Sequence, residues 1–86
     1  MKKKYEKADR EFQRAVIERD GCCQVCGMVT ETLVAHHIVT RRRIDTRHDL
    51  SNGITLCYTH HRWAHDRPAA FRTMLATWHI KKRLIK

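Results

Sequence analysis

The segment NGITLCYTHH, residues 52–61, combines a turn signal, a short strand and two residue types that bind metals. The apolar and β-branched residues at 54–57 predict a strand, and the Asn-Gly pair before them is a typical turn sequence. Cys57 and His60 are separated by two residues where the strand gives way to a predicted helix. This spacing allows a thiolate and an imidazole to bind one ion.

A second pair of ligand residues with the same spacing lies upstream. Cys23 and Cys26 are followed by Gly27, which eases the chain as it doubles back. Together with Cys57 and His60, this pair predicts a closed, structural Cys3His zinc site. Such a site could contribute on the order of 10 kcal/mol to folding. The alternatives are a pair of disulfides or unligated thiols, and the leftover Cys22 is expected to be a small buried or free thiol.

Length and charge limit the class of protein. The chain has 86 residues, which predicts one small domain over 1–86. A domain of this size has an apolar core that is only marginally sufficient to stabilise the fold. Its 18 Lys and Arg against 9 Asp and Glu give a net charge of +9, which points to a polyanion, nucleic acid first. No apolar run is long enough to span a membrane, and charged residues stand where a signal peptide would be apolar. We therefore expect a cytosolic protein with reduced cysteines.

The hydrophobic pattern predicts an α+β fold with two short strands between helices. Gly21 is well placed to end the first helix, and Pro68 suits the first turn of the last one. The apolar stripe of the last helix makes core packing the expected role of Trp78 rather than stacking on bases. In chain order, the predicted elements are a helix over about 5–19, a turn at 23–27, a strand over 32–39, a loop over 40–51, a strand over 54–57, a helix over 58–66 and a helix over about 68–80.

The remaining histidines form two informative groups. His36 and His37 are adjacent at the end of the first strand, where their side chains should point to opposite sides. His61 and His65 are four residues apart, on one face of a helix. If strand and helix pack together, three imidazoles make an open site that favours Zn, Ni, Co or Mn over Mg. Alternatively, these histidines solvate a helix face or bridge a wider zinc cluster. The spacing suggests no partner for His48 or His79.

The order and spacing of these residues resemble the HNH endonuclease family, over residues about 19–66. The family has a small ββα-metal (His-Me finger) core, here with a Cys3His zinc knuckle and flanking N- and C-terminal helices. The first helix, with Phe12-x2-Ala15-Val16, is similar to the lead-in helix of compact, phage-type members. The matching residues are Cys23-x2-Cys26, His36-His37, Asn52-Gly53, Cys57-x2-His60-His61 and His65.

The resemblance implies a role for each matching residue. His37 would be the general base that activates water, and Asn52 would hold the loop and the base in position. His36, His61 and His65 would bind one catalytic divalent ion (Zn, Ni, Mn, Co or Mg). The cysteines and His60 would bind structural zinc. Most knuckle-bearing members carry a fourth cysteine where this chain has His60.

A group of arginines in the predicted loop suggests where DNA would bind. Basic side chains contact phosphates without reading sequence, so binding should be largely nonspecific and sensitive to salt. The alternative is a solvated face that keeps the protein soluble. Loop arginines expected to contact phosphate are Arg41, Arg42, Arg43 and Arg47, and further basic clusters lie at 2–4 and 81–86.

The sequence thus predicts a metal-dependent DNA endonuclease that nicks or cuts both strands. The resemblance suggests a phage or prophage origin and action in the cytoplasm of a bacterial host. One alternative is a zinc-stabilised nucleic-acid-binding module without catalysis. Another is a subunit of a packaging complex, with terminase or other phage proteins as partners. A homodimer would place two active sites for a double-strand cut.

Overall fold

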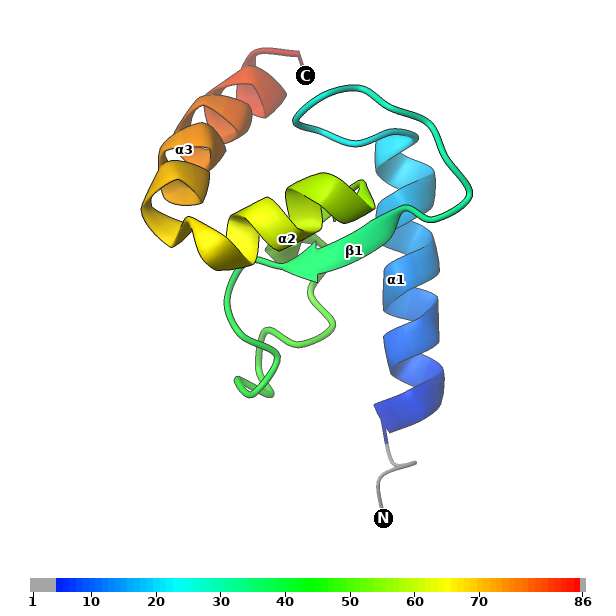
Figure 1. Ribbon diagram of the computed structural model, residues 1–86. Helices are drawn as coiled ribbons and strands as arrows, with labels where there is room; N and C mark the ends of the chain where they lie inside the picture. The colour runs from blue at the N-terminus through cyan, green and yellow to red at the C-terminus, as the bar shows by residue number, and fades with distance from the viewer. Residues whose placement is uncertain (1–4, 86) are drawn as a thin grey trace.

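The computed structural model describes residues 5–85, and side chains as far as Trp78. It contains three α-helices, one short 3-10 helix and a two-stranded antiparallel sheet, which confirms the predicted α+β fold class (Figure 1). The elements in chain order are α1 (Glu6–Asp20), β1 (Val34–His37), η2 (Leu50–Asn52), β2 (Gly53–Leu56), α2 (Tyr58–Asp66) and α3 (Pro68–Ile85).

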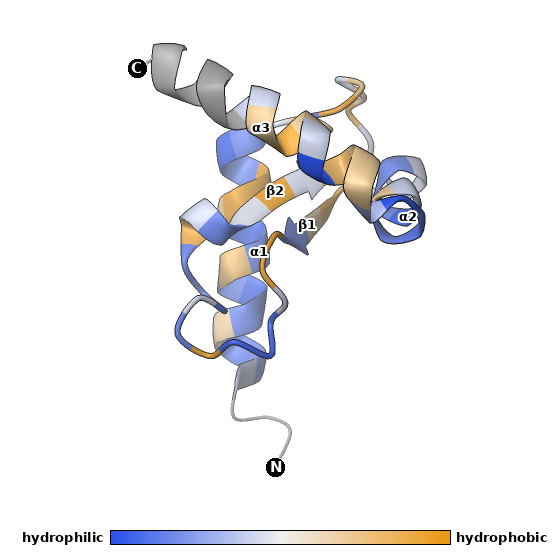
Figure 2. Cartoon of the chain, turned by 90° about the vertical axis from the view of Figure 1, so that its left-hand side faces the viewer, coloured by the Kyte–Doolittle hydropathy of each residue, from blue (hydrophilic) through white to orange (hydrophobic). Residues whose placement is uncertain are grey.

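The sheet lies between α1 on one face and α2 with α3 on the other. Ala35 pairs with Thr55, and both face α1, where Ala35 joins a small core with Phe12 and Val16. The neighbouring residues of β2 face the opposite way and join the larger core, in which apolar residues of β2 and α3 meet (Figure 2). That larger core contains Cys23, Ile54, Leu56, Cys57, Ala64, Phe71, Leu75 and Trp78.

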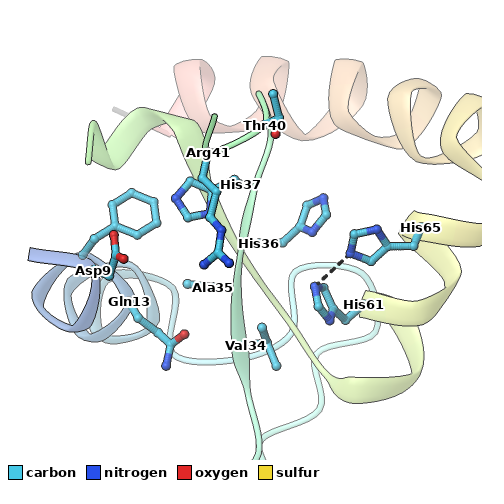
Figure 3. Close-up of a pocket in the computed structure, with 11 residues that line it drawn as sticks. Asp9, Gln13, Val34, Ala35, His36, His37, Thr40, Arg41, His61 and His65 are labelled. Carbon is cyan, nitrogen blue, oxygen red and sulfur yellow. Dashed lines mark hydrogen bonds between the residues drawn. The ribbon is translucent and has the colours of Figure 1, made fainter. Parts of the chain in front are cut away.

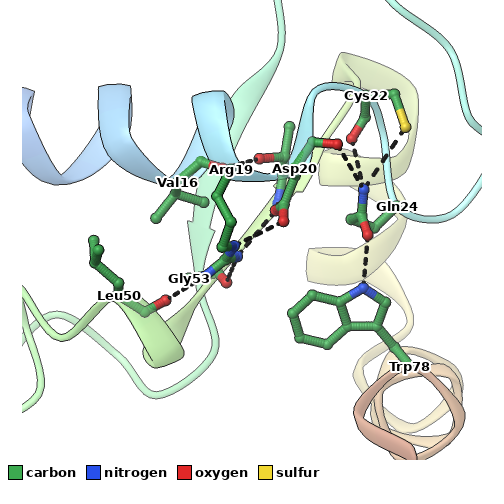
Figure 4. Close-up of polar contacts among 9 residues, drawn as sticks. Val16, Arg19, Asp20, Cys22, Gln24, Leu50, Gly53 and Trp78 are labelled. Carbon is green, nitrogen blue, oxygen red and sulfur yellow. Dashed lines mark hydrogen bonds and ion pairs between the residues drawn. The ribbon is translucent and has the colours of Figure 1, made fainter. Parts of the chain in front are cut away.

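The end of α1 is fixed to β2 by a buried carboxylate. Gly21 adopts the left-handed conformation (φ 73°) that ends the helix, as predicted. Just before it, Asp20 accepts hydrogen bonds from the Thr55 N–H at 2.9 Å and from Arg19 at 2.8 Å (Figure 4). Burial alone would raise the pKa of Asp20, but these hydrogen bonds outweigh it and hold the pKa below its usual value. The charged carboxylate therefore sets where α1 lies on the sheet.

The Asn-Gly pair does not form the hairpin turn that its sequence suggests. Asn52 ends η2, and Gly53 opens β2 with an extended backbone (φ −122°). Glycine is required here by packing. A Cβ at this position would lie 2.6 Å from Cγ2 of Val16 and 2.8 Å from Cζ of Phe12. The absence of a side chain thus allows α1 to approach the strand closely.

Element boundaries differ from the predicted ones mainly in the first strand and the last helix. β1 covers 34–37 rather than 32–39. Residues 31–32 are still in a turn, where the Thr32 N–H bonds to the Thr30 hydroxyl, and after the strand the N–H groups of Ile38 and Val39 bond to the backbone and side chain of Asn52. α2 has the predicted bounds, and α3 continues to Ile85. In the described part of the chain, none of the helices has the length and apolar character needed to span a bilayer.

Candidate active site and zinc site

Four predicted zinc ligands meet at one point. Cys23 and Cys26 come from the turn after α1, Cys57 follows β2, and His60 lies in the first turn of α2. The Sγ atom of Cys57 lies 3.3 Å from Nδ1 of His60, and two further separations within the cluster are 3.8 and 3.9 Å. A tetrahedral ion with Zn–S bonds of about 2.3 Å requires sulfurs about 3.8 Å apart. The donor types and their separations therefore fit a metal such as zinc.

Backbone hydrogen bonds hold the turn that carries Cys23 and Cys26. The Gly27 N–H donates to the Cys23 carbonyl at 2.8 Å, with Gly27 in the left-handed region (φ 79°). Burial opposes ionisation of Cys23, but hydrogen bonds from the backbone N–H groups of Cys26 and Cys57 outweigh it and lower the pKa of the thiol to about 6. A lowered pKa favours the thiolate that binds metal.

A neighbouring residue ties this turn to β2 and α3. The Gln24 N–H donates to the Thr55 carbonyl at 2.9 Å, and its side-chain oxygen accepts the indole N–H of Trp78 at 2.8 Å (Figure 4). Cys22 lies outside the cluster, with its Sγ 3.7 Å from Nε2 of Gln24. All four cysteines, which fall within the described residues, are unpaired thiols.

Three histidines form a second cluster, beside another face of α2. His36 extends from β1, and His61 and His65 extend from α2, with one ring nitrogen of each within 4.8 Å of the others (Figure 3). Burial and the neighbouring histidines lower the pKa of His36 to about 4, and burial with His65 lowers the pKa of His61. Neutral imidazoles keep the lone pairs that bind metal. The structure thus separates His60, which faces the cysteines, from His61, which faces the histidines.

His37 points away from this cluster, as predicted for neighbours on a strand. Its ring stacks on Phe12 of α1, with centroids 4.6 Å apart and planes 13° apart. Its Nε2 lies 2.9 Å from the backbone carbonyl of Arg47. Because a carbonyl can only accept, Nε2 must carry the proton, and Nδ1 is left with the free lone pair. The contact therefore selects the tautomer in which Nδ1 of His37 is the nitrogen that can take up a proton.

The three-histidine cluster and His37 line one cavity of about 480 Å³. This volume is in the usual range for ligand clefts, which is about 300–1,000 Å³. The helix α1 forms one wall, β1 the floor and α2 the opposite wall, as Figure 3 shows. The lining residues include Asp9, Phe12, Gln13, His36, His37, Thr40, Arg41, His61 and His65.

Asn52 holds the loop between the strands at two points. Its buried side chain donates from Nδ2 to the carbonyls of Val39 (3.0 Å) and Thr46 (3.1 Å). Its Oδ1 accepts the Val39 N–H at 2.7 Å. The side chain thus closes the loop 39–46 immediately before Arg47, whose carbonyl contacts His37.

The four loop arginines do not share one environment. Arg41 lines the cavity, while Arg42 and Arg43 are exposed on the loop, and Arg43 forms an exposed ion pair with Asp45 at 3.0 Å. Arg47 is largely buried, with its side chain 17% exposed and bound by another residue. The cluster at 2–4 lies outside the described residues, as do the side chains of 81–86.

The residue that binds Arg47 is Asp9 of α1, which the sequence analysis did not identify. Its carboxylate accepts two hydrogen bonds from the Arg47 guanidinium and one from Nε2 of His48 at 2.7 Å. The hydrogen bond from Arg47, helped by His48, holds the pKa of Asp9 well below its usual range. The sequence contained one indication that Asp9 lies near the site, because Asp9 precedes Phe12 by three residues and so shares its helix face. The partners are 38 and 39 residues away along the chain, so no spacing pattern links them.

Comparison with known proteins gives one match. A family model described as HNH endonuclease matches residues 23–71, more than half of the chain. The matched range contains both metal-ligand clusters and ends at Phe71 on α3, whereas α1 lies outside it. No curated protein and no solved structure matches the chain at a significant level.

Proposed function

Because the chain belongs to the HNH endonuclease family, we propose that it is a metal-dependent enzyme that hydrolyses phosphodiester bonds of DNA. Family membership confirms the resemblance drawn from the sequence and makes nuclease activity the expected function. The observation that carries the proposal is the cavity itself. It brings a three-imidazole cluster and a histidine in the tautomer of a general base to opposite sides of one space.

In the proposed reaction, His37 activates water. Its Nδ1 accepts a proton as the water oxygen bonds to phosphorus and the bond to the 3′ oxygen breaks. The imidazolium that forms is stabilised by the Arg47 carbonyl on Nε2, and Phe12 keeps the ring plane fixed. The leaving 3′ oxygen takes a proton from a solvent water, so the products are a 5′-phosphate and a 3′-hydroxyl. A positioned general base contributes about 10²–10⁴-fold to such a rate.

The two metal clusters have separate roles in this proposal. His36, His61 and His65 would hold one divalent ion, and Asn52 would keep the loop beside it in place. When bound, that ion supplies Lewis-acid stabilisation of charge on the phosphate and on the leaving oxygen. Imidazole donors suit Zn, Ni, Co or Mn better than Mg. Structural zinc would be held by Cys23, Cys26, Cys57 and His60.

DNA would approach the open side of the cavity along the arginine-bearing loop. Arg41 lines the cavity and the exposed Arg42 and Arg43 extend the positive surface, so all three are proposed to contact phosphates. The surface ion pair of Arg43 with Asp45 is weak enough to be exchanged for a phosphate. Arg47 adds positive charge near the cavity while its guanidinium remains bound to Asp9.

A supercoiled-plasmid assay tests the proposed activity. Protein with measured zinc content is incubated with DNA in EDTA, Mg, Mn, Co, Ni and Zn separately. We expect nicking or linearisation that requires a divalent ion, and two bound ions per chain by elemental analysis. The variant His61→Ala, which leaves the cysteine cluster intact, should bind one ion and not cut. Salt-sensitive DNA binding with no cutting in any metal would instead indicate a binding module.

The double variant Arg42→Ala, Arg43→Ala should weaken DNA binding and flatten its dependence on salt. The slope of log K against log salt is negative, and each lost phosphate contact makes it shallower by about 0.9. Loss of two contacts should therefore make it shallower by about 1.8. Filter-binding titrations over a range of salt concentrations measure this slope. The control Arg67→Ala, Arg72→Ala removes the same charge from exposed residues that do not line the cavity. Equal slopes for the two double variants would contradict the phosphate contacts.

We place the enzyme in a phage or prophage, acting in the bacterial cytoplasm, on the similarity of α1 to the lead-in helix of phage-type members. Co-purification with terminase or other phage proteins tests the packaging role. Light scattering of the purified chain tests whether a homodimer provides two active sites.

A further inference from the structure

The helix α1 makes a bidentate contact with the end of the loop between β1 and η2, residues 38–49. Both carboxylate oxygens of Asp9 accept hydrogen bonds from the Arg47 guanidinium, at 2.9 and 2.7 Å, and Oδ1 also accepts Nε2 of His48. The guanidinium carbon lies 4.8 Å from the centre of the Tyr5 ring. The side chains are only 17% (Arg47) and 29% (Asp9) exposed. Bidentate geometry and partial burial distinguish this contact from an ordinary surface ion pair.

The same residue that Asp9 holds by its side chain holds His37 by its backbone. The Arg47 carbonyl lies 2.9 Å from Nε2 of His37. One turn along α1 from Asp9, Phe12 stacks on the His37 ring. The helix α1 therefore contacts His37 directly through Phe12. It also contacts His37 indirectly, because Asp9 binds the residue whose carbonyl lies on Nε2.

Asn52 and Asp9 hold different parts of the loop. Asn52 bonds to residues 39 and 46, whereas Asp9 bonds to the side chains of residues 47 and 48. Further contacts of Arg47 with the loop are long, at 3.4 Å from its N–H to the Ile44 carbonyl and 3.3 Å from Nη1 to the Arg41 carbonyl. Without Asp9, the peptide after Arg47 would be free to rotate its carbonyl away from the imidazole.

We propose that Asp9 is a positioning residue for His37, acting through Arg47 to keep the backbone carbonyl on Nε2 and Nδ1 free. This inference rests on the proposed role of His37 as general base. It assigns part of the active site to α1, which lies outside the matched family range. In effect, an ion pair at the cavity wall selects the tautomer of the base.

The first experiment compares Asp9→Asn with Glu6→Gln. Glu6 is an exposed acid on the same helix, paired with Arg10 at 3.9 Å, so the control removes the same charge from a surface pair. At saturating DNA, we expect Asp9→Asn to cut about ten- to a hundredfold more slowly, since misplacing a catalytic group by about 1 Å costs up to about 10²-fold. The Kd for DNA should match that of the control. Equal rates for the two variants would overturn the proposal.

A second measurement does not depend on cutting. Ring ¹⁵N spectra of the zinc-loaded protein report which nitrogen of His37 carries the proton. We expect one tautomer, protonated at Nε2, in the wild type and in Glu6→Gln, and a mixture in Asp9→Asn. An unchanged single tautomer in Asp9→Asn would overturn the proposal. If the wild type does not cut DNA, the proposed function fails while these spectra still decide the role of Asp9.

A third variant guards against misfolding of Asp9→Asn. Arg47→Lys keeps the charge and the backbone carbonyl but cannot form the bidentate contact. It should show the same tautomer mixture and slower cutting, with little further loss when combined with Asp9→Asn. Additive losses in the double variant would mean that the two residues act separately.

Discussion

Replacing His37 with glutamine is expected to slow DNA cutting by about 10²–10⁴-fold, the contribution of a positioned general base. The glutamine amide can still donate to the Arg47 carbonyl, so the loop keeps its contact, but it offers no nitrogen that can accept a proton. Single-turnover cleavage of a supercoiled plasmid measures the rate. Elemental analysis should find both metal clusters loaded as in the wild type.

Two controls separate a lost general base from other causes of slower cutting. The affinity of His37→Gln for DNA should be unchanged, because His37 adds no charge in its neutral form. Added imidazole should partly restore cutting in His37→Ala, since the cavity of about 480 Å³ can admit the free base. A His37→Gln protein that cuts at the wild-type rate would remove His37 from the mechanism and leave the three-imidazole cluster without a base.

Replacing Cys57 with serine is expected to unfold the protein. The apparent free energy of zinc binding in small zinc-dependent domains is about 10–16 kcal/mol, as large as the whole stability of a typical domain. Cys57 is buried in the larger core and is also a proposed zinc ligand, so its loss is expected to affect the cluster and β2 together. Circular dichroism and zinc content measure the result, and a strong chelator should have the same effect on the wild type.

Cys22→Ser is the matched control for this variant. Cys22 is the same residue type and lies next to a ligand, but its thiol contacts Gln24 and not the cluster. We expect wild-type zinc content and a melting temperature close to that of the wild type. If Cys22→Ser lost zinc as completely as Cys57→Ser, or if Cys57→Ser remained folded without zinc, the assigned ligand set would be wrong.

Local signals in the sequence predicted the helices and the membership of both clusters. Gly21 and Pro68 mark helix ends because their backbone preferences act on their immediate neighbours. The ligand pairs are detectable because metal coordination restricts the spacing of residues that share a turn. These features depend on a few consecutive residues, so the sequence alone could indicate them.

Features that depend on contact between distant segments were not predicted. The turn signal at Asn52-Gly53 marks a turn that ends at Asn52, but it did not indicate that Gly53 opens β2, where the close approach of Phe12 and Val16 from α1 leaves no room for a side chain. The end of the first strand was predicted two residues too late because Asn52 accepts the N–H groups of Ile38 and Val39. The contact between Asp9 and His48 has no signature in the sequence, because it forms only when α1 lies on the loop. In each case the tertiary contact overrides the local preference.

The four-residue strand β1 also limits how this protein can diverge. His36 and His37 serve opposite sides of the sheet only because successive side chains alternate, so inserting or deleting one residue in β1 would exchange their environments. Asn52 likewise restricts the length of the loop, because its side chain bonds to the carbonyls of both Val39 and Thr46. We expect changes in length to be best tolerated at residues 29–32, between the Met28 carbonyl, which accepts the Cys23 N–H, and Leu33, which packs against the larger core. An engineer who wished to add a DNA-recognition element would insert it there and leave the chemistry intact.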